Sequence, residues 1–456
     1  MTRLLREMER KTQQQRSFAR GALLFSALQQ WQFWAIAGVV VVLFGLCWWL
    51  RKRSQQPDSS SEEESSSSDS EQVQDEGGEF EDHLLFSEMY IHWPVQNRVS
   101  ECVTVKDLVD NFMLVFRSLL LNSLFPELQS AIGLGSAFEG WSPCEEDVIY
   151  HVLVPMKPPR SHTFHLELWD AGETMARNFR IRVEQKCTCM RERLVGDVPC
   201  FLHHPEEEQR RNEKHSLLDT LCTGFYLDAQ KTARWFHLLV RSAWVLLPQA
   251  SSFRLKMLPC SRSCKFQLTR PDQKRIIIEI LSGVQQGDSD IFVTSQSTEA
   301  IFTPSTMWPE SYAVAEVKFF QHVAQQAPRD TFHLKCLQVC AHILVGIDIS
   351  TYTLKTVVMH LLNTLPLGGW NRREVMMRLQ DIMEYLCACL EEKRLNHFFF
   401  GNENMPEEII LPPALQMAEP HNIFQHLVHD PEAHAKALHE FNELKSRLVR
   451  LLLCGH

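Results

Sequence analysis

Short runs of alternating or continuous apolar residues occur in the first half of the chain, and turns rich in proline or polar residues bound them. Such runs are typical of β-strands, because successive side chains of a strand point to opposite faces of a sheet. Apart from these runs, Val103–Ser130 carries apolar residues at helical spacing and predicts a helix interrupted at Pro126. The predicted strands are Asp147–Pro155, Thr163–Asp170, Phe179–Cys189, Pro199–Leu202 and Arg275–Leu281, of which the third and fourth can form a hairpin.

Beyond Trp308 the apolar residues recur at a helical period. The predicted helices are Tyr312–Gln326, Asp330–Val345, Tyr352–Leu362, Arg373–Lys393 and Pro431–Leu453. This change of pattern predicts an α+β lobe over residues 84–305 and a helical lobe over residues 306–456.

An uncharged apolar stretch lies near the N-terminus, from Trp34 to Leu50. It extends to about 20 residues when Trp31 is included, which matches the thickness of a bilayer core. Trp31 and Trp34 at one end, with Trp48 and Trp49 at the other, resemble the aromatic belts of membrane interfaces. We therefore expect a transmembrane helix over residues 31–50. A core helix of the globular body is the alternative interpretation.

Charge is concentrated in the segment that follows, residues 51–83. Ser54–Asp82 carries 11 acidic residues and no Lys or Arg, so the formal charge of the rest changes from −10 to −10 + 11 = +1. Its low hydrophobicity and single charge sign predict a disordered linker. A nearly neutral remainder excludes a strongly basic nucleic-acid-binding protein, although it is compatible with a local basic patch.

The orientation in the membrane rests on weaker signals. Basic residues occur both in the charged segment 1–30 and in Arg51–Arg53, so the positive-inside rule favours neither side clearly. The 14 cysteines are scattered through apolar segments without a disulfide-like framework, which is typical of a reducing compartment. We therefore expect a single-pass protein of the plasma membrane or endoplasmic reticulum with a cytosolic body.

Three carboxylates and a Gly-Ser pair are the strongest candidates for chemistry. Glu145 and Asp147 are two residues apart, so they share one face of a strand. Glu279 lies within an apolar run, where a charge is costly unless it is paired, protonated or metal-bound. Such carboxylates can hold Mg²⁺, and the backbone N–H groups at Gly135 and Ser136 can hold phosphates. A surface turn and an ordinary strand end would give the same spacing.

A second set of residues has ligand types that suit zinc: Cys187, Cys189, Cys200, His203 and His204. Their spacing departs from the usual C-x₂₋₄-C pattern, and partly buried hairpin cysteines are the simpler interpretation.

The order of several motifs resembles a known family. After the helix at about residue 103 the motifs are GSAFEGW (Gly135–Trp141), EEDVIYHVLVP (Glu145–Pro155), IIIEIL (Ile276–Leu281), WPESYAVAE (Trp308–Glu316), HLKCLQ (His333–Gln338), STYTLKT (Ser350–Thr356) and LEEKRLNHFF (Leu390–Phe399). This set resembles the Mab-21 group of nucleotidyltransferase-fold proteins, which includes the cyclic GMP-AMP synthase. The apolar span, the acidic linker and the stretch Cys187–Glu208 are similar to the inositol 1,4,5-trisphosphate receptor-interacting protein group.

The resemblance implies a nucleotidyltransferase-like mixed-sheet lobe, a helical lobe and a single membrane anchor. By position, Ser136 would contact phosphate, Glu145 and Asp147 would bind metal, and Glu279 would stand where active relatives have Asp. The extra methylene of Glu279 displaces its carboxylate, to which octahedral Mg²⁺ is sensitive. We therefore expect a non-catalytic interaction protein.

The partners implied by the resemblance are membrane proteins, either the inositol trisphosphate receptor or an immune receptor. The alternatives are a Mg²⁺-dependent nucleotidyltransferase and a sensor of a nucleotide or inositol phosphate.

Overall fold

The computed structural model describes residues 95–121, 123–142, 148–160, 162–169, 177–186, 217–296, 303–328 and 331–454. All of them lie in the compact unit Asp82–His456. The predicted membrane helix and acidic linker lie outside the described residues. Within the described part of the chain, no helix has both the length and the apolar character needed to cross a membrane.

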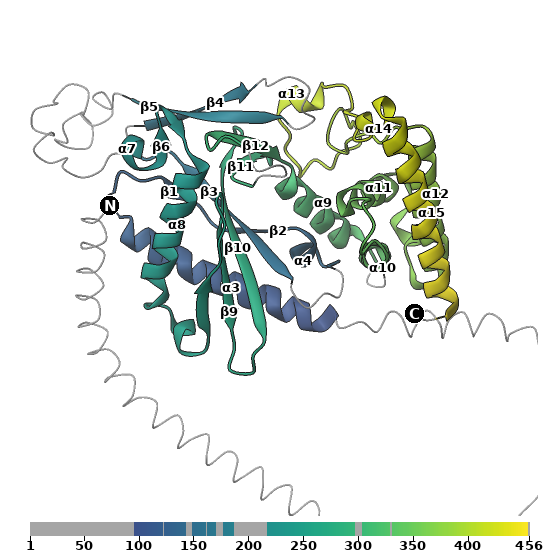
Figure 1. Ribbon diagram of the computed structural model, residues 1–456, viewed down its shortest axis with the longest axis horizontal. Coiled ribbons are helices and arrows are strands. Elements are labelled where there is room, and N and C mark those ends of the chain that lie inside the picture. Colours follow the sequence, from purple (N-terminus) through teal and green to yellow (C-terminus); the bar gives the residue numbers. More distant parts are fainter. Residues whose placement is uncertain are drawn as a thin grey trace, which may run out of the picture. The chain divides into compact units, whose positions relative to one another are not determined.

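Twelve of the described strands form one twisted, mostly antiparallel sheet (Figure 1). The strands are β1 (Glu127–Leu128), β2 (Ile132–Leu134), β3 (Ile149–Lys157), β4 (His162–Trp169), β5 (Asn178–Gln185), β6 (Cys222–Thr223), β7 (Tyr226–Leu227), β8 (Arg254–Met257), β9 (Cys264–Thr269), β10 (Arg275–Gln285), β11 (Phe292–Thr294) and β12 (Met307–Ser311). Its centre is the parallel pair β3–β10, in which His151 is opposite Glu279.

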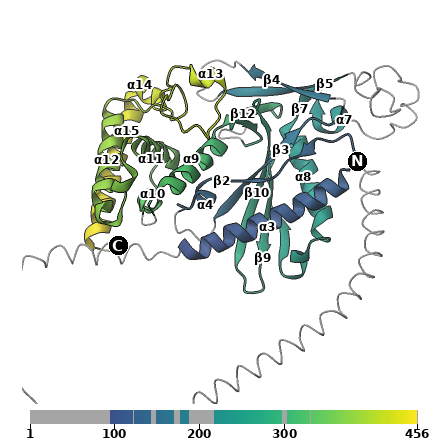
Figure 2. The same cartoon turned by 180° about the vertical axis from the view of Figure 1, so that it is seen from behind.

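Helices cover both faces of this sheet. The helices that accompany it are α3 (Val95–Leu119), α4 (Ser136–Glu139), α7 (Leu217–Leu221), α8 (Ala229–Trp244) and α9 (Ala313–Gln326), with a 3₁₀ turn at Pro248–Ser251. Helix α3 runs along one face of the sheet (Figure 2). The rings of Phe112 on α3 and Phe266 on β9 are 5.9 Å apart, which places the helix against the sheet. On the opposite face, Val314 and Val317 of α9 pack against Leu153 and Leu281.

A helical lobe follows the sheet. It consists of α10 (His333–Ile343), α11 (Thr351–Thr364), α12 (Val375–Glu391), α13 (Pro413–Gln416), α14 (Gln425–His429) and α15 (Pro431–Cys454), with 3₁₀ turns at Leu367–Gly369 and Arg372–Glu374. Its core includes the fully buried side chains of Trp370, Phe398 and Phe399. The expected order of a mixed α+β part before helices is therefore confirmed.

Several boundaries differ from the sequence prediction. Helix α3 ends at Leu119, before the end of the predicted helix. The short strand β1 follows Pro126 directly, where the prediction continued the helix. Helix α8 was not predicted, although Asp228 caps it by accepting hydrogen bonds from the backbone N–H groups of Gln230 and Lys231. Strand β12 lies after residue 306, where the sequence predicted the helical lobe to begin. It belongs to the sheet because it pairs with β5, whose residues are more than 120 positions away in the chain.

Candidate functional site

The Gly-Ser pair forms a tight turn between β2 and α4. Gly135 has φ 78° and ψ −176°, a conformation that residues with a Cβ rarely adopt. The turn is closed by backbone hydrogen bonds from Glu139 N–H to Gly135 O and from Trp141 N–H to Ser136 O, both 3.0 Å. Glycine is also required at Gly133, where a Cβ would lie 2.4 Å from the ring of Phe138. Both glycines therefore have a steric reason to be present.

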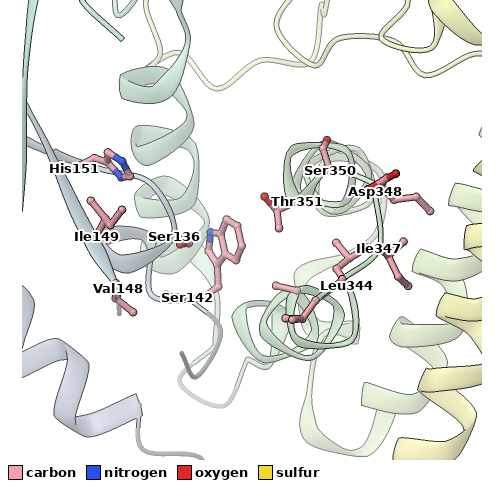
Figure 3. A pocket seen from close by; sticks show the side chains of 15 residues that line it. Ser136, Ser142, Val148, Ile149, His151, Leu344, Ile347, Asp348, Ser350 and Thr351 are labelled. Atoms are coloured by element: carbon pink, nitrogen blue, oxygen red, sulfur yellow. The ribbon is translucent and has the colours of Figure 1, made fainter. Parts of the chain in front are cut away.

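A pocket of about 680 Å³ lies between this turn and the helical lobe. On the sheet side it is lined by Ser136, Ile149 and His151, and on the helical side by residues 344–351 (Figure 3). More than half of its described lining residues are apolar. The ionisable lining residues among them are His151 and Asp348, and neither Lys nor Arg lines the described part of the pocket.

The structure therefore brings Ser136, which follows Gly135 in the turn, to a pocket, but it does not describe every predicted site residue. Glu145 and Asp147 lie outside the described residues, as do all five candidate zinc ligands. Among the residues that the structure does describe, no three His, Cys, Asp or Glu side chains are grouped so that they could hold a metal ion.

Glu279 lies beside the pocket in a cluster of polar side chains. Its Oε1 accepts a hydrogen bond from the Ser263 hydroxyl at 2.5 Å, and its Oε2 lies 3.7 Å from both Lys265 Nζ and His151 Nε2. The charge within the apolar run is thus paired, which is one of the three possibilities that the sequence left open. A carboxylate already neutralised by an ammonium group does not fit a Mg²⁺ ligand, because the metal would have to approach a cation.

His151 connects this cluster to the pocket. Burial lowers its pKa, and Lys265 acts in the same direction, while Glu279 opposes them. The lowered pKa keeps the imidazole neutral at pH 7, so His151 presents a hydrogen-bonding group, not a positive charge, to the pocket.

A buried group of charges behind the pocket was missed by the sequence analysis. Lys355 of α11 donates to Glu139 Oε1 at 2.6 Å and to Glu316 Oε2 at 2.5 Å. Burial raises the pKa of Glu139, whereas the two carboxylates raise the pKa of Lys355 against the effect of burial. Glu139 and Glu316 each have apolar neighbours in the sequence, the same signal that drew attention to Glu279.

This group links the two lobes. Glu139 belongs to α4 next to Ser136, and its Oε2 also accepts a hydrogen bond from the indole of Trp141 at 2.6 Å. Glu316 belongs to α9, which packs on the sheet, and Lys355 belongs to α11 of the helical lobe. The three side chains therefore fix the Gly-Ser turn relative to α9 and α11.

The C-terminal helix α15 holds the other wall of the pocket. Arg447 donates to the carbonyl oxygens of Ile343 at 3.2 Å and Val345 at 2.6 Å, at the end of α10. Lys436 pairs with Asp348 in the same loop. These contacts position the segment that forms most of the helical side of the pocket.

Comparison with known proteins agrees with this arrangement. The Mab-21 protein HhH/H2TH-like domain matches residues 333–412, which include α10, α11 and α12. The inositol 1,4,5-trisphosphate receptor-interacting protein-like 1 of Rattus norvegicus is 35% identical over 381 residues, covering 81% of this chain and 69% of the relative. The protein of the same name from Mus musculus is 35% identical over 380 residues, with the same coverage. The inositol 1,4,5-trisphosphate receptor-interacting protein of Homo sapiens is 27% identical over 367 residues, covering 75% of this chain and 66% of the relative.

A mixed sheet that faces a Mab-21 helical domain across a pocket defines a Mab-21-type protein, and the domain match implies a nucleotidyltransferase-like fold. Within that class, the chain belongs to the inositol 1,4,5-trisphosphate receptor-interacting protein family. The resemblance found in the sequence motifs is thereby confirmed.

Proposed function

We propose that this protein is a single-pass, membrane-anchored Mab-21 family member that acts through contacts with membrane receptors without turning over a nucleotide. The relatives named above are called inositol 1,4,5-trisphosphate receptor-interacting proteins, and that receptor is the partner we propose first. An immune receptor is the other partner that the family resemblance implies.

The observation that carries the non-catalytic assignment is the environment of Glu279. In a two-metal mechanism all three acidic residues must offer unshared oxygens to the ions. Glu279 instead faces the ammonium of Lys265, with Ser263 on its second oxygen. The pocket adds a second argument, because its described lining offers no Lys or Arg to compensate a triphosphate.

A sensor of a small ligand is the second candidate. The Gly135–Ser136 turn opens onto a pocket of about 680 Å³, a volume in the range of small-molecule sites. Binding without turnover would combine this pocket with a Glu279 side chain whose surroundings do not fit a Mg²⁺ ligand.

The first test uses the full-length chain purified in detergent. We expect no nucleotide product from ATP and GTP with Mg²⁺ or Mn²⁺, and the same result for Glu279→Asp, which restores the acid of active relatives. We also expect capture of purified inositol 1,4,5-trisphosphate receptor by the wild-type chain and by Glu145→Ala/Asp147→Ala.

Product formation that disappears in Glu145→Ala/Asp147→Ala would establish the transferase. Nucleotide-dependent thermal stabilisation without product, combined with no receptor capture, would favour the sensor.

The membrane topology has its own test, based on Cys260. This thiol is exposed, and cleavage after Lys and Arg releases it in the short peptide Met257–Arg262. If the body is cytosolic, a membrane-impermeant maleimide should label Cys260 only after the cells are permeabilised. Buried Cys336 and Cys340 serve as internal controls, since they should stay unlabelled in the folded protein. Labelling of Cys260 in intact cells would place the body outside.

A further inference from the structure

A basic surface lies on the sheet next to the pocket. Residues 229–275 contain ten Lys or Arg residues and one acidic residue, Asp272. This is the local basic patch with which the overall charge was compatible. Several of these cations are used internally: Lys265 pairs with Glu279, Lys274 pairs with Glu101, and Arg262 donates to backbone carbonyl groups.

Three cations of strands β8 and β10 are not used in this way. Arg254, Lys256 and Arg275 are exposed, and none of them pairs with an acidic side chain among the described residues. Strand register places them on one face, since directly opposed residues of neighbouring strands point to the same side. Thr269 of β9 is opposite both Arg254 of β8 and Arg275 of β10. Lys256 is opposite Gln267 in the next row.

The same face continues to the pocket. In the following row Lys265 is opposite Glu279, which is opposite His151 of the pocket lining. The inward-facing residues of the two strands, such as Phe266 and Ile278, are buried in the core beneath α3 and α8. The basic face of β8–β10 is thus a lateral extension of the candidate site.

This face also contains an open edge. Strand β8 pairs with β9 and with no other described strand, so one row of its backbone N–H and C=O groups has no strand partner there. Charged residues on an edge strand oppose pairing with a second basic edge, and the same charges favour an acidic strand. Along β8, Arg254 and Lys256 are about 7 Å apart, the spacing of alternate residues in an extended peptide.

We propose that the face of β8–β10 that carries Arg254, Lys256 and Arg275 binds an acidic, extended polypeptide segment of the partner. The segment adds to the edge of β8, so that its Glu or Asp residues at alternate positions lie beside Arg254 and Lys256, and Arg275, on β10 across β9, adds positive charge on the same face. This assignment rests on the proposed interaction function, for which it supplies a contact surface.

Two other polyanions fit this face less well. Single-stranded nucleic acid is bound through stacking on aromatic residues, and the outward positions of β8, β9 and β10 carry Gln267, Thr269 and Ile277 between the cations. Proteins that bind an anionic membrane surface stably combine cations with a second signal, such as apolar side chains that insert between lipids. The exposed large apolar side chains of the described residues lie outside β8, β9 and β10.

The test measures peptide binding to the full-length chain in detergent by fluorescence anisotropy. The probe is a fluorescein-labelled peptide of about ten residues with Glu at alternate positions, and its control is the same peptide with Gln. We expect Arg254→Glu/Lys256→Glu/Arg275→Glu to weaken binding of the Glu peptide at least about tenfold. Binding should also weaken as the salt concentration rises, since exposed charges are screened.

The matched control reverses three exposed cations elsewhere, Lys106→Glu/Arg160→Glu/Lys445→Glu, with the same change in net charge. It should change peptide affinity less than about twofold. If the triple Glu variant does not fold, Arg254→Gln/Lys256→Gln/Arg275→Gln answers the same question with a smaller perturbation. Equal weakening by both sets of substitutions would leave only a net-charge effect and overturn the proposal.

Three further results would overturn it: unchanged affinity in the patch variant, equal binding of the Gln peptide, or displacement of the peptide by single-stranded DNA or phosphatidylserine vesicles at lower concentration than by unlabelled peptide. Failure of the proposed receptor interaction gives a different result from failure of this binding face. If only the receptor interaction is wrong, the purified chain binds the Glu peptide but does not capture the receptor.

Discussion

Lys355→Met is expected to lower the free energy of unfolding by about 3–5 kcal/mol, because it leaves two carboxylates buried without their counter-charge. The ammonium of Lys355 lies within 2.6 Å of oxygens of both Glu139 and Glu316, and all three side chains are almost inaccessible to water. Urea unfolding of the full-length chain in detergent, followed by tryptophan fluorescence, measures this change. Trp141 is a suitable reporter because its indole donates to Glu139.

Two comparisons separate the loss of a buried charge from a general effect of losing a lysine. Lys436→Met removes an exposed ammonium that pairs with Asp348, and it should change the midpoint of unfolding little. Glu139→Gln/Glu316→Gln/Lys355→Met removes all three charges together, and it should recover much of the stability lost in the single variant. Equal destabilisation by Lys436→Met and Lys355→Met would contradict the role of the buried group.

The second large effect that we expect is a loss of stability in mildly acidic solution through His397. Burial, with smaller contributions from His421 and His360, lowers the pKa of His397 to about 3. Its Nδ1 accepts from the backbone N–H of Phe399 at 3.3 Å, and its Nε2 lies 2.8 Å from the hydroxyl of Tyr352. A proton on Nδ1 would break the first of these contacts.

The direction in which stability changes with pH follows from the difference in proton binding at His397 between the folded and unfolded chains. The unfolded chain binds a proton at His397 near pH 6.5, whereas the folded chain does not do so until about pH 3. The stabilising contribution is therefore complete above pH 6.5 and is lost as the pH falls toward 3. At pH 5 the loss from this residue is about 2 kcal/mol.

The measurement is the free energy of unfolding at pH 7.5 and pH 5 for the wild type and His397→Gln. The wild type should lose about 2 kcal/mol more than the variant between the two pH values. Other buried histidines remain in both proteins, including His333 with its pKa lowered to about 4, so their contribution cancels in the difference. The same pH dependence in both proteins would show that His397 is not the group that titrates.

Local patterns predicted much of the fold because periodicity reports burial directly. The strand at residues 275–281 and the helix at residues 312–326 correspond to β10 and α9 with small shifts of their ends. Short strands such as β8, β11 and β12 were not predicted. They have three to five residues, and their partners across the sheet determine their conformation more than their own sequence does.

The candidate site likewise has features that the sequence predicted and features that depend on tertiary contacts. Gly135 and Ser136 could be identified from a local motif, and the structure shows the positive φ of Gly135 that favours glycine there. The sequence also showed that Glu279 is a charge in an apolar run, but it left open whether the side chain is paired, protonated or metal-bound. That question depended on Lys265 and His151, which neighbouring strands bring to its two sides.

By itself, the sequence determined the mixed first part and the helical second part, the family and the position of Glu279 as a charge in an apolar run, because these properties depend on local composition and spacing. Only the tertiary structure decided which charges meet. The pairing of Glu139 with Lys355 joins residues 216 positions apart, and the alignment of Arg254 with Arg275 across Thr269 results from strand register. The physical reason is that the energy of a buried charge depends on its nearest partners in space, and the chain order alone does not specify those partners.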